Sequence, residues 1–266
     1  FNTAYMVWDE IKMQREETIE SIVSNYNGEI MELADGISEI ANLPDSFSAR
    51  LRISGKCLLD LVLNFAYIFE VSEAETIAMG DAPENNDNLI ETVQIEAPTQ
   101  SAPIVCVMDS GIQEEHKYLA PAISSGESIS LLPNNTDISD EVAGGGHGTR
   151  VAGAVLYPKT VPSDGVYQLP CWIRNMRILD ENNCLPENVY PPKAIDIAVQ
   201  KYNVENPIPT KIFNHSIGSR RSCEMKHMTP WAAEIDSQSY NHDVLFIQAA
   251  GNISTDVILA YWQAGY

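Results

Sequence analysis

Hydrophobic residues in the second half of the chain come in short unbroken runs, separated by stretches with helical spacing. Such runs are typical of strands that are buried on both faces of a parallel sheet. The runs cover residues 104–108, 171–179, 211–215 and 244–250. The helical stretches cover residues 147–156, 193–202 and 231–240. This alternation predicts an α/β fold with a doubly wound, mostly parallel sheet over residues 103–266.

The first part of the chain has a different pattern. Residues 5–26 place apolar side chains three to five positions apart with charges between them, which predicts a helix. After a turn at Asn27-Gly28, a strand, a helix and a second strand are expected at residues 48–53, 56–64 and 65–71. Residues 1–72 therefore predict a small N-terminal α+β domain. Residues 73–102 are acidic and contain prolines, which predicts a linker.

The charge balance limits the classes of partner. The 266 residues carry a formal net charge of -21, with a sequence pI of about 4.4. A field of this sign repels nucleic acid and anionic membrane surfaces, so neither is expected as a partner. No apolar run approaches the length that spans a membrane.

Cysteine usage indicates a reducing environment. The five cysteines have no paired spacing, so no disulfide framework is expected. The N-terminal residues also lack the pattern of a secretory signal, and a cytoplasmic location is the expectation. Because the sequence begins at Phe1, a removed signal and a secreted protein stay open as the alternative.

Three polar residues follow predicted strands or a glycine-rich loop. Asp109 ends the first apolar run and is followed by Ser110 and Gly111. A carboxylate at the carboxyl edge of a parallel sheet is well placed to hold an imidazole N–H, which would fix its tautomer. Taken alone, Asp109 is more simply a turn or capping residue.

His147 lies within the sequence GGGHGTRVAG, so its ring is expected to stand free of neighbouring side chains. That arrangement suits a general base. A glycine-rich loop that opens a helix also suits a phosphate site, but the third glycine of the dinucleotide fingerprint is missing here.

Asn252 follows the last apolar run within AAGN. Its amide is placed to donate to a developing oxyanion, although an Asn in a turn is equally consistent with this position.

Together these segments resemble the subtilisin-like serine proteases, in which D-S/T-G, H-G-T-x-V-A-G and A-A-G-N occur in this order. The resemblance runs from about Ile104 to the end and includes NHSIG, which is similar to the groove strand of the family. It implies a serine endopeptidase that acts on peptides or proteins. Asp109 would orient the base, His147 would be the base, and Asn252 would bind the oxyanion. Ser216, Ile217 and Gly218 would bind the substrate.

The resemblance also bears on the N-terminal domain. Relatives of subtilisin often carry a small α+β propeptide that assists folding and inhibits the protease, and the pattern of residues 48–71 is similar to it. An unrelated domain is an equal alternative.

The nucleophile of the family is missing from this sequence. It lies in G-T-S-x-A-x-P beyond A-A-G-N, and no G-T-S occurs here. Ser216, Ser219 and Cys223 lack the placement of a nucleophile. We therefore expect an active protease whose triad Ser lies outside this chain, in a C-terminal continuation or on a second chain that completes the fold. The chain alone is expected to be inactive, and the alternative is a pseudoprotease or peptide-binding module that uses the same groove.

No cofactor is required by this chemistry, and no metal ligand is predicted. Structural calcium occurs in the family, but no ligand loop for it is legible in this sequence. A zinc site from His215, Cys223, His227 and His242 has irregular spacing and remains a minor hypothesis.

Overall fold

A computed structural model describes most of the chain. The residues described are 2–33, 37–38, 40–43, 46–72, 92–124, 126–218, 228–251 and 259. None of the helices in these ranges is long and apolar enough to cross a membrane.

The second half of the chain is built on a five-stranded sheet in which every pair of neighbours is parallel. The strands are, in spatial order, β13 (Leu245–Gln248), β12 (Ile212–His215), β8 (Ile104–Asp109), β11 (Trp172–Arg177) and β9 (Ile129–Ser130). The prediction of a mostly parallel α/β sheet is confirmed.

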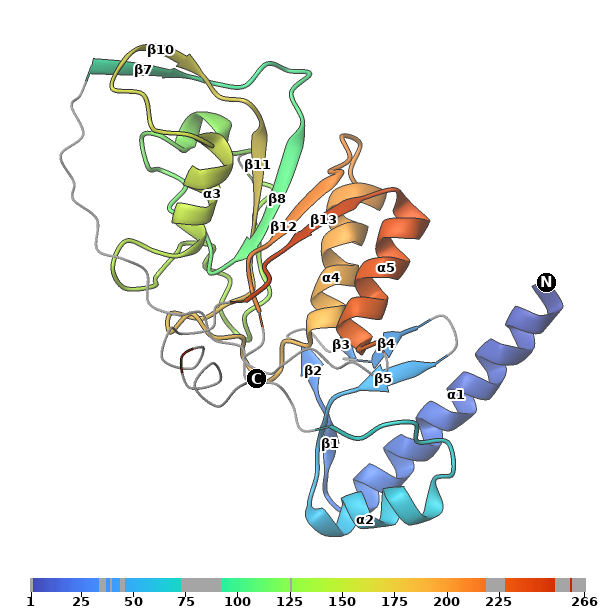
Figure 1. Cartoon of the computed structure of the whole chain (residues 1–266). Coiled ribbons are helices and arrows are strands. Elements are labelled where there is room, and N and C mark those ends of the chain that lie inside the picture. Colours follow the sequence, from blue (N-terminus) through green and yellow to red (C-terminus); the bar gives the residue numbers. More distant parts are fainter. Residues whose placement is uncertain are drawn as a thin grey trace.

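Helices cover both faces of this sheet (Figure 1). Helix α3 (Gly148–Leu156) packs on one face, in a core cluster that includes Val107 and Ile173. Helices α4 (Pro191–Val199) and α5 (Pro230–His242) lie on the other face, where Phe213 is part of the core. Residues that alternate along β8 therefore bury their side chains in two separate cores, which is why the strand reads as a continuous apolar run.

The strand order places a topological switch point beside β8. The chain runs from β8 to β9 and β11 on one side, and then crosses to β12 and β13 on the other side. In open parallel sheets, ligands bind at the carboxyl ends of the strands where the order reverses. The carboxyl end of β8 is residue Asp109.

The N-terminal unit consists of two helices and short antiparallel strand pairs. Ser54 caps the second helix, because its hydroxyl accepts a hydrogen bond from the backbone N–H of Cys57 at 3.3 Å. The elements are α1 (Asn2–Asn25), β1 (Glu29–Ile30), β2 (Glu32–Leu33), β3 (Ile37–Ser38), β4 (Ile40–Asn42), β5 (Phe47–Ala49), β6 (Leu51–Arg52) and α2 (Gly55–Asn64).

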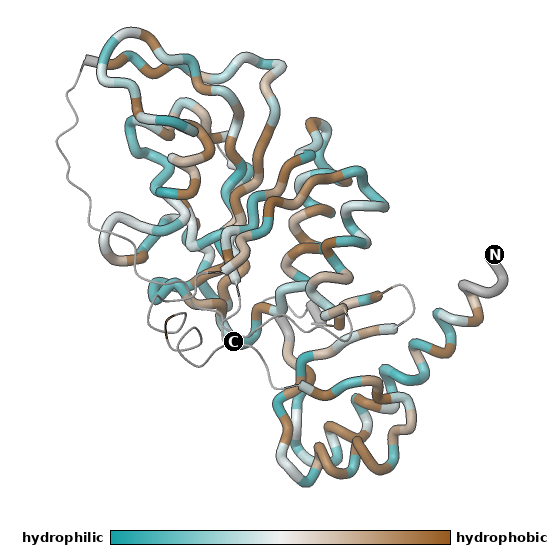
Figure 2. The backbone as a smooth tube through the Cα atoms, viewed as in Figure 1, coloured by the Kyte–Doolittle hydropathy of each residue, from teal (hydrophilic) through white to brown (hydrophobic). Residues whose placement is uncertain are grey.

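The core of the N-terminal unit is small. Val23 of α1 packs against Cys57 and Leu61 of α2, and Figure 2 shows hydrophobic residues along much of α2. Leu59 and Leu63 on the same helix are nevertheless exposed. The unit thus buries only part of its apolar surface.

Three expectations about local structure need correction. In the described part of the chain residues 65–71 form no strand, because Phe65 closes α2 through a bond from its N–H to the carbonyl oxygen of Leu61 and a turn follows. The strand expected at 48–53 is divided between β5 and β6. Within the expected linker, β7 (Thr92–Glu96) is a strand that pairs in parallel with β10 (Asp164–Gln168). The expected linker at residues 73–102 therefore contains a folded strand near its C-terminal end.

The N-terminal unit contacts the other half of the chain near the start of α4. Strand β4 lies against α4 and α5. Arg50 donates to the carbonyl oxygen of Val189 at 3.2 Å, and the hydroxyl groups of Ser48 and Tyr190 are hydrogen bonded. A salt bridge of 3.2 Å joins Arg52 to Glu187, but both side chains are exposed, so it contributes little to stability.

Candidate active site

Asp109 is a buried carboxylate at the end of the central strand. Its side chain is 1% exposed. The backbone N–H of Ile178 donates to the carbonyl oxygen of Asp109 at 2.7 Å, which fixes the main chain at this point. Because β8 is paired on both sides, the position of this carboxylate is set by the sheet itself.

His147 brings an imidazole to this carboxylate from the start of α3. It immediately precedes α3, and its Nδ1 atom lies 2.7 Å from Oδ1 of Asp109. The His147 side chain is 16% exposed. Among the described residues, nothing is hydrogen bonded to Nε2. The contact holds the proton on Nδ1, so that Nε2 is left as the basic atom.

The environment changes the acidity of both groups. The hydrogen bond to Asp109 raises the pKa of His147 above its ordinary value, and burial opposes this in part. Burial raises the pKa of Asp109, while the hydrogen bonds from His147 and Ser110 oppose that rise. An imidazole with a raised pKa is a stronger base, which is what proton abstraction requires.

A second carboxylate, Asp140, supports this pair and was not predicted from the sequence. Its Oδ2 accepts from the backbone N–H of Thr149 at 2.8 Å, in the first turn of α3. Its Oδ1 accepts from the hydroxyl of Ser110 at 2.9 Å, and the same hydroxyl accepts from the N–H of Gly148 at 2.9 Å. The helix that carries His147 is thereby tied to the residue after Asp109.

Two glycines beside His147 are required by close contacts. Gly146 has a φ of +79°, and a Cβ atom there would overlap the carboxylate of Asp140. A Cβ atom on Gly148 would overlap the carbonyl oxygen of Gly111. These contacts explain physically why glycines flank the histidine.

We expect Gly146→Ala to displace His147. In the full-length protein, kcat/KM should fall by about a hundredfold, since a misplacement of about 1 Å has this effect on a catalytic group. Gly145→Ala is the matched control, because Gly145 also has a positive φ but its Cβ would meet only the end of Arg150, at 3.6 Å. Steady-state kinetics on a peptide substrate would test this, and equal losses in both variants would contradict it.

The segment Ser216–Gly218 follows β12 directly, next to the end of β8. Ile217 is fully buried, and Ser216 donates its hydroxyl to Oδ1 of Asn214 at 2.7 Å. A Cβ atom on Gly218 would lie 3.3 Å from Cα of Gly251, so the ends of β12 and β13 are in close contact.

Asn252 lies outside the described residues, as do Ser219, Cys223 and His227. The structure therefore brings together Asp109 and His147, and Ser216–Gly218 follows the strand next to β8. The substrate-binding role of this segment and the role of Asn252 stay predictions. Of the zinc hypothesis, His215 is fully buried with Nδ1 2.5 Å from Gln248. Among the described residues there is no group of three side chains that could hold a metal ion.

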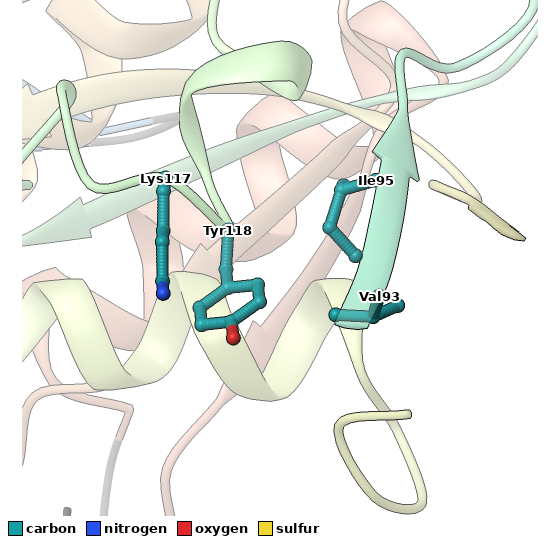
Figure 3. A pocket seen from close by; sticks show the side chains of 4 residues that line it. All are labelled: Val93, Ile95, Lys117 and Tyr118. Carbon is teal, nitrogen blue, oxygen red and sulfur yellow. The ribbon is translucent and has the colours of Figure 1, made fainter. Parts of the chain in front are cut away.

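A pocket of about 330 Å³ lies elsewhere, beside β7 (Figure 3). Val93 and Ile95 of β7 line it together with Lys117 and Tyr118. It includes neither Asp109 nor His147.

Comparisons with known proteins identify a family and similar solved structures. The Subtilase family (Peptidase_S8) matches residues 100–264. A solved structure of a serine-to-alanine mutant of the epidermin leader peptide processing serine protease (EpiP) from Staphylococcus aureus is similar, with a TM-score of 0.58 and 16% identity over 94% of this chain. A second structure of EpiP has a TM-score of 0.48 and 15% identity over 94% of this chain.

This chain spans 62% of the length of both EpiP chains. None of the curated proteins matches the sequence significantly. The identity to EpiP is low, so that likeness concerns the fold, whereas the family match covers more than half of the chain. With its parallel sheet and the Asp109–His147 pair at the switch point, the chain belongs to the subtilase family of serine proteases.

Proposed function

We propose that the protein is a subtilisin-type serine endopeptidase whose nucleophilic Ser lies outside this chain. The observation that carries the proposal is the hydrogen bond of 2.7 Å between Nδ1 of His147 and the buried carboxylate of Asp109. A neutral imidazole in this arrangement accepts the proton of an attacking hydroxyl at Nε2 and later returns it to the leaving amine.

Asp109 has two roles in this mechanism. It keeps the proton of neutral His147 on Nδ1, so that Nε2 is the base, and it stabilises the imidazolium that forms when Nε2 takes up a proton. Its own burial makes the interaction strong, because little water is present to screen it.

Asn252 is proposed to donate to the oxyanion of the tetrahedral intermediate. Its support is its place in AAGN, directly after Gly251, which lies against the groove segment. Ser216, Ile217 and Gly218 are proposed to line the groove, where an extended peptide substrate adds to their backbone in the manner of an extra strand. No cofactor enters the mechanism.

Experiments on the full-length gene product would test the proposal. We expect a serine-directed fluorophosphonate probe to label it once, and we expect it to cleave an internal bond of a peptide library. Mass spectrometry of the intact product would locate the labelled Ser relative to Tyr266. A full-length product that resists the probe but binds peptides would instead support the alternative, a pseudoprotease or peptide-binding module.

We also propose that residues 1–72 act as a propeptide-like domain. The support is their contact with α4 and α5, through β4 and through the bond from Arg50 to Val189. Residues 1–72 added to a mature protease that lacks them should inhibit it, and an absence of inhibition would favour an unrelated domain.

A further inference from the structure

One side chain ties the end of β12 to the end of β13. His215 and Gln248 are register partners on these parallel strands, and Nδ1 of His215 lies 2.5 Å from Oε1 of Gln248. The Nε2 atom of Gln248 donates to the carbonyl oxygens of Ile217 at 2.6 Å and Ala249 at 3.1 Å. A single amide therefore bridges the segments that follow the two strands.

The bonding pattern fixes the orientation of the Gln248 amide. The atom that faces two carbonyl oxygens must be the nitrogen, because only the nitrogen donates. The amide oxygen then faces His215, so Nδ1 of His215 carries a proton and donates it. Burial lowers the pKa of His215 to about 4, and the ring is therefore neutral near pH 7. His215 acts as a neutral donor.

His215 is itself held in place by packing. Its side chain is fully buried, and its ring meets the ring of Trp231 edge to face, with centroids 5.2 Å apart and an interplanar angle of 81°. Trp231 belongs to the first turn of α5. The orientation of Gln248 is thus set from the core, although β13 is the outermost strand of the sheet among the described residues.

The carbonyl oxygen that Gln248 holds is the one in the middle of the groove segment. Ser216–Gly218 continues directly from β12, and alternate residues of extended backbone direct their carbonyl groups to opposite sides. With this segment extended like the strand before it, a carbonyl of Ile217 held by Gln248 would direct the backbone groups of Ser216 and Gly218 the other way. Those two residues are then left for an added peptide strand.

We propose that Gln248, oriented by His215, is a positioning residue for substrate. It holds the carbonyl of Ile217 so that Ser216 and Gly218 present their backbone groups to an extended peptide. This inference rests on the proposed function, since it concerns the same groove. It adds a specific side chain that sets the geometry of the groove without touching the reacting atoms.

Gln248→Glu in the full-length protein removes the donor of both bonds and keeps the size of the side chain. Gln168→Glu is the matched control, because Gln168 is exposed at the end of β10 and makes the same change of charge outside the site. Hydrogen–deuterium exchange over residues 212–218 should become about tenfold faster in Gln248→Glu, since a lost bond to a partly buried carbonyl has this effect. Exchange equal to that of the control would overturn the proposal.

Kinetics give a second readout that a general loss of stability would not produce. For a long peptide, kcat/KM should fall by about tenfold, mainly through KM, while a short ester substrate should change by less than about twofold. Equal losses for both substrates would overturn the positioning role.

His215→Phe keeps an aromatic ring against Trp231 but removes the donor to Gln248. It should accelerate exchange over residues 212–218 by about threefold, a smaller change in the same direction, because only the orientation of the amide is lost. An exchange rate equal to that of the wild type would overturn the part assigned to His215.

The failure of the proposed function can be told apart from the failure of this inference. If the wild-type protein neither cleaves peptides nor reacts with the fluorophosphonate, the proposed function fails, and the exchange experiment still decides whether Gln248 holds the segment.

Discussion

Replacing His147 with alanine in the full-length protein should lower kcat by about a millionfold, the size of the loss when the triad histidine of subtilisin is removed. The reason is structural. In the described part of the chain, no other imidazole is hydrogen bonded to a carboxylate at the carboxyl edge of the sheet. Single-turnover kinetics with a peptide ester would measure the loss, and labelling by a fluorophosphonate should slow in parallel because the hydroxyl is no longer activated.

His116→Ala is the matched control for this variant. His116 is exposed, and its ring lies against Tyr118 rather than a carboxylate. We expect its kcat to stay within about twofold of the wild-type value, as for most surface substitutions. A His147→Ala variant with wild-type kcat would exclude His147 as the base.

Replacing Asp109 with asparagine should lower kcat by about ten thousandfold, as the equivalent change does in the Ser-His-Asp triad. The amide can stabilise the wrong tautomer of His147 and cannot balance the charge of the imidazolium. Asp164→Asn is the matched control, since Asp164 is exposed on β10. Equal kcat values for the two variants would contradict the orienting role of Asp109.

The pH profile of Asp109→Asn gives an independent measurement. In the wild type, the bond to Asp109 raises the pKa of His147, so the inactive imidazolium persists to higher pH and activity falls on the acid side below that raised pKa. Without the carboxylate, the pKa of His147 falls. The acid limb of the residual kcat/KM should therefore move to lower pH, and an unchanged limb would assign it to another group.

Much of the sheet and the positions of Asp109 and His147 could be predicted from the sequence, because they follow from local patterns. The apolar run that ends at Asp109 is a strand buried on both faces, and the glycines around His147 mark a helix start with close backbone contacts. Both signals lie within a few residues of the groups that they position.

Asp140, Gln248 and β7 could not be found in the same way. Asp140 acts on Ser110, 30 residues earlier, from a stretch with no hydrophobic period. Gln248 falls within an apolar run, and its hydrogen bonds depend on its register with His215 on the neighbouring strand. In β7, Val93 and Ile95 alternate as in a strand, but the partner that makes it one is β10. These features depend on contacts between segments far apart in the sequence, which local sequence patterns do not reveal.

The hydrogen bond that Asp140 accepts from Thr149, at the start of α3, has a further consequence for the base. The first turn of a helix carries a partial positive charge, of about half an elementary charge, from its aligned peptide dipoles. His147 lies at that end of α3, where such a charge disfavours imidazolium. The carboxylate of Asp140 on the N–H of Thr149 neutralises this macrodipole, and it also raises the pKa of His147. The dipole of the helix that positions His147 is therefore kept from lowering the pKa of this base.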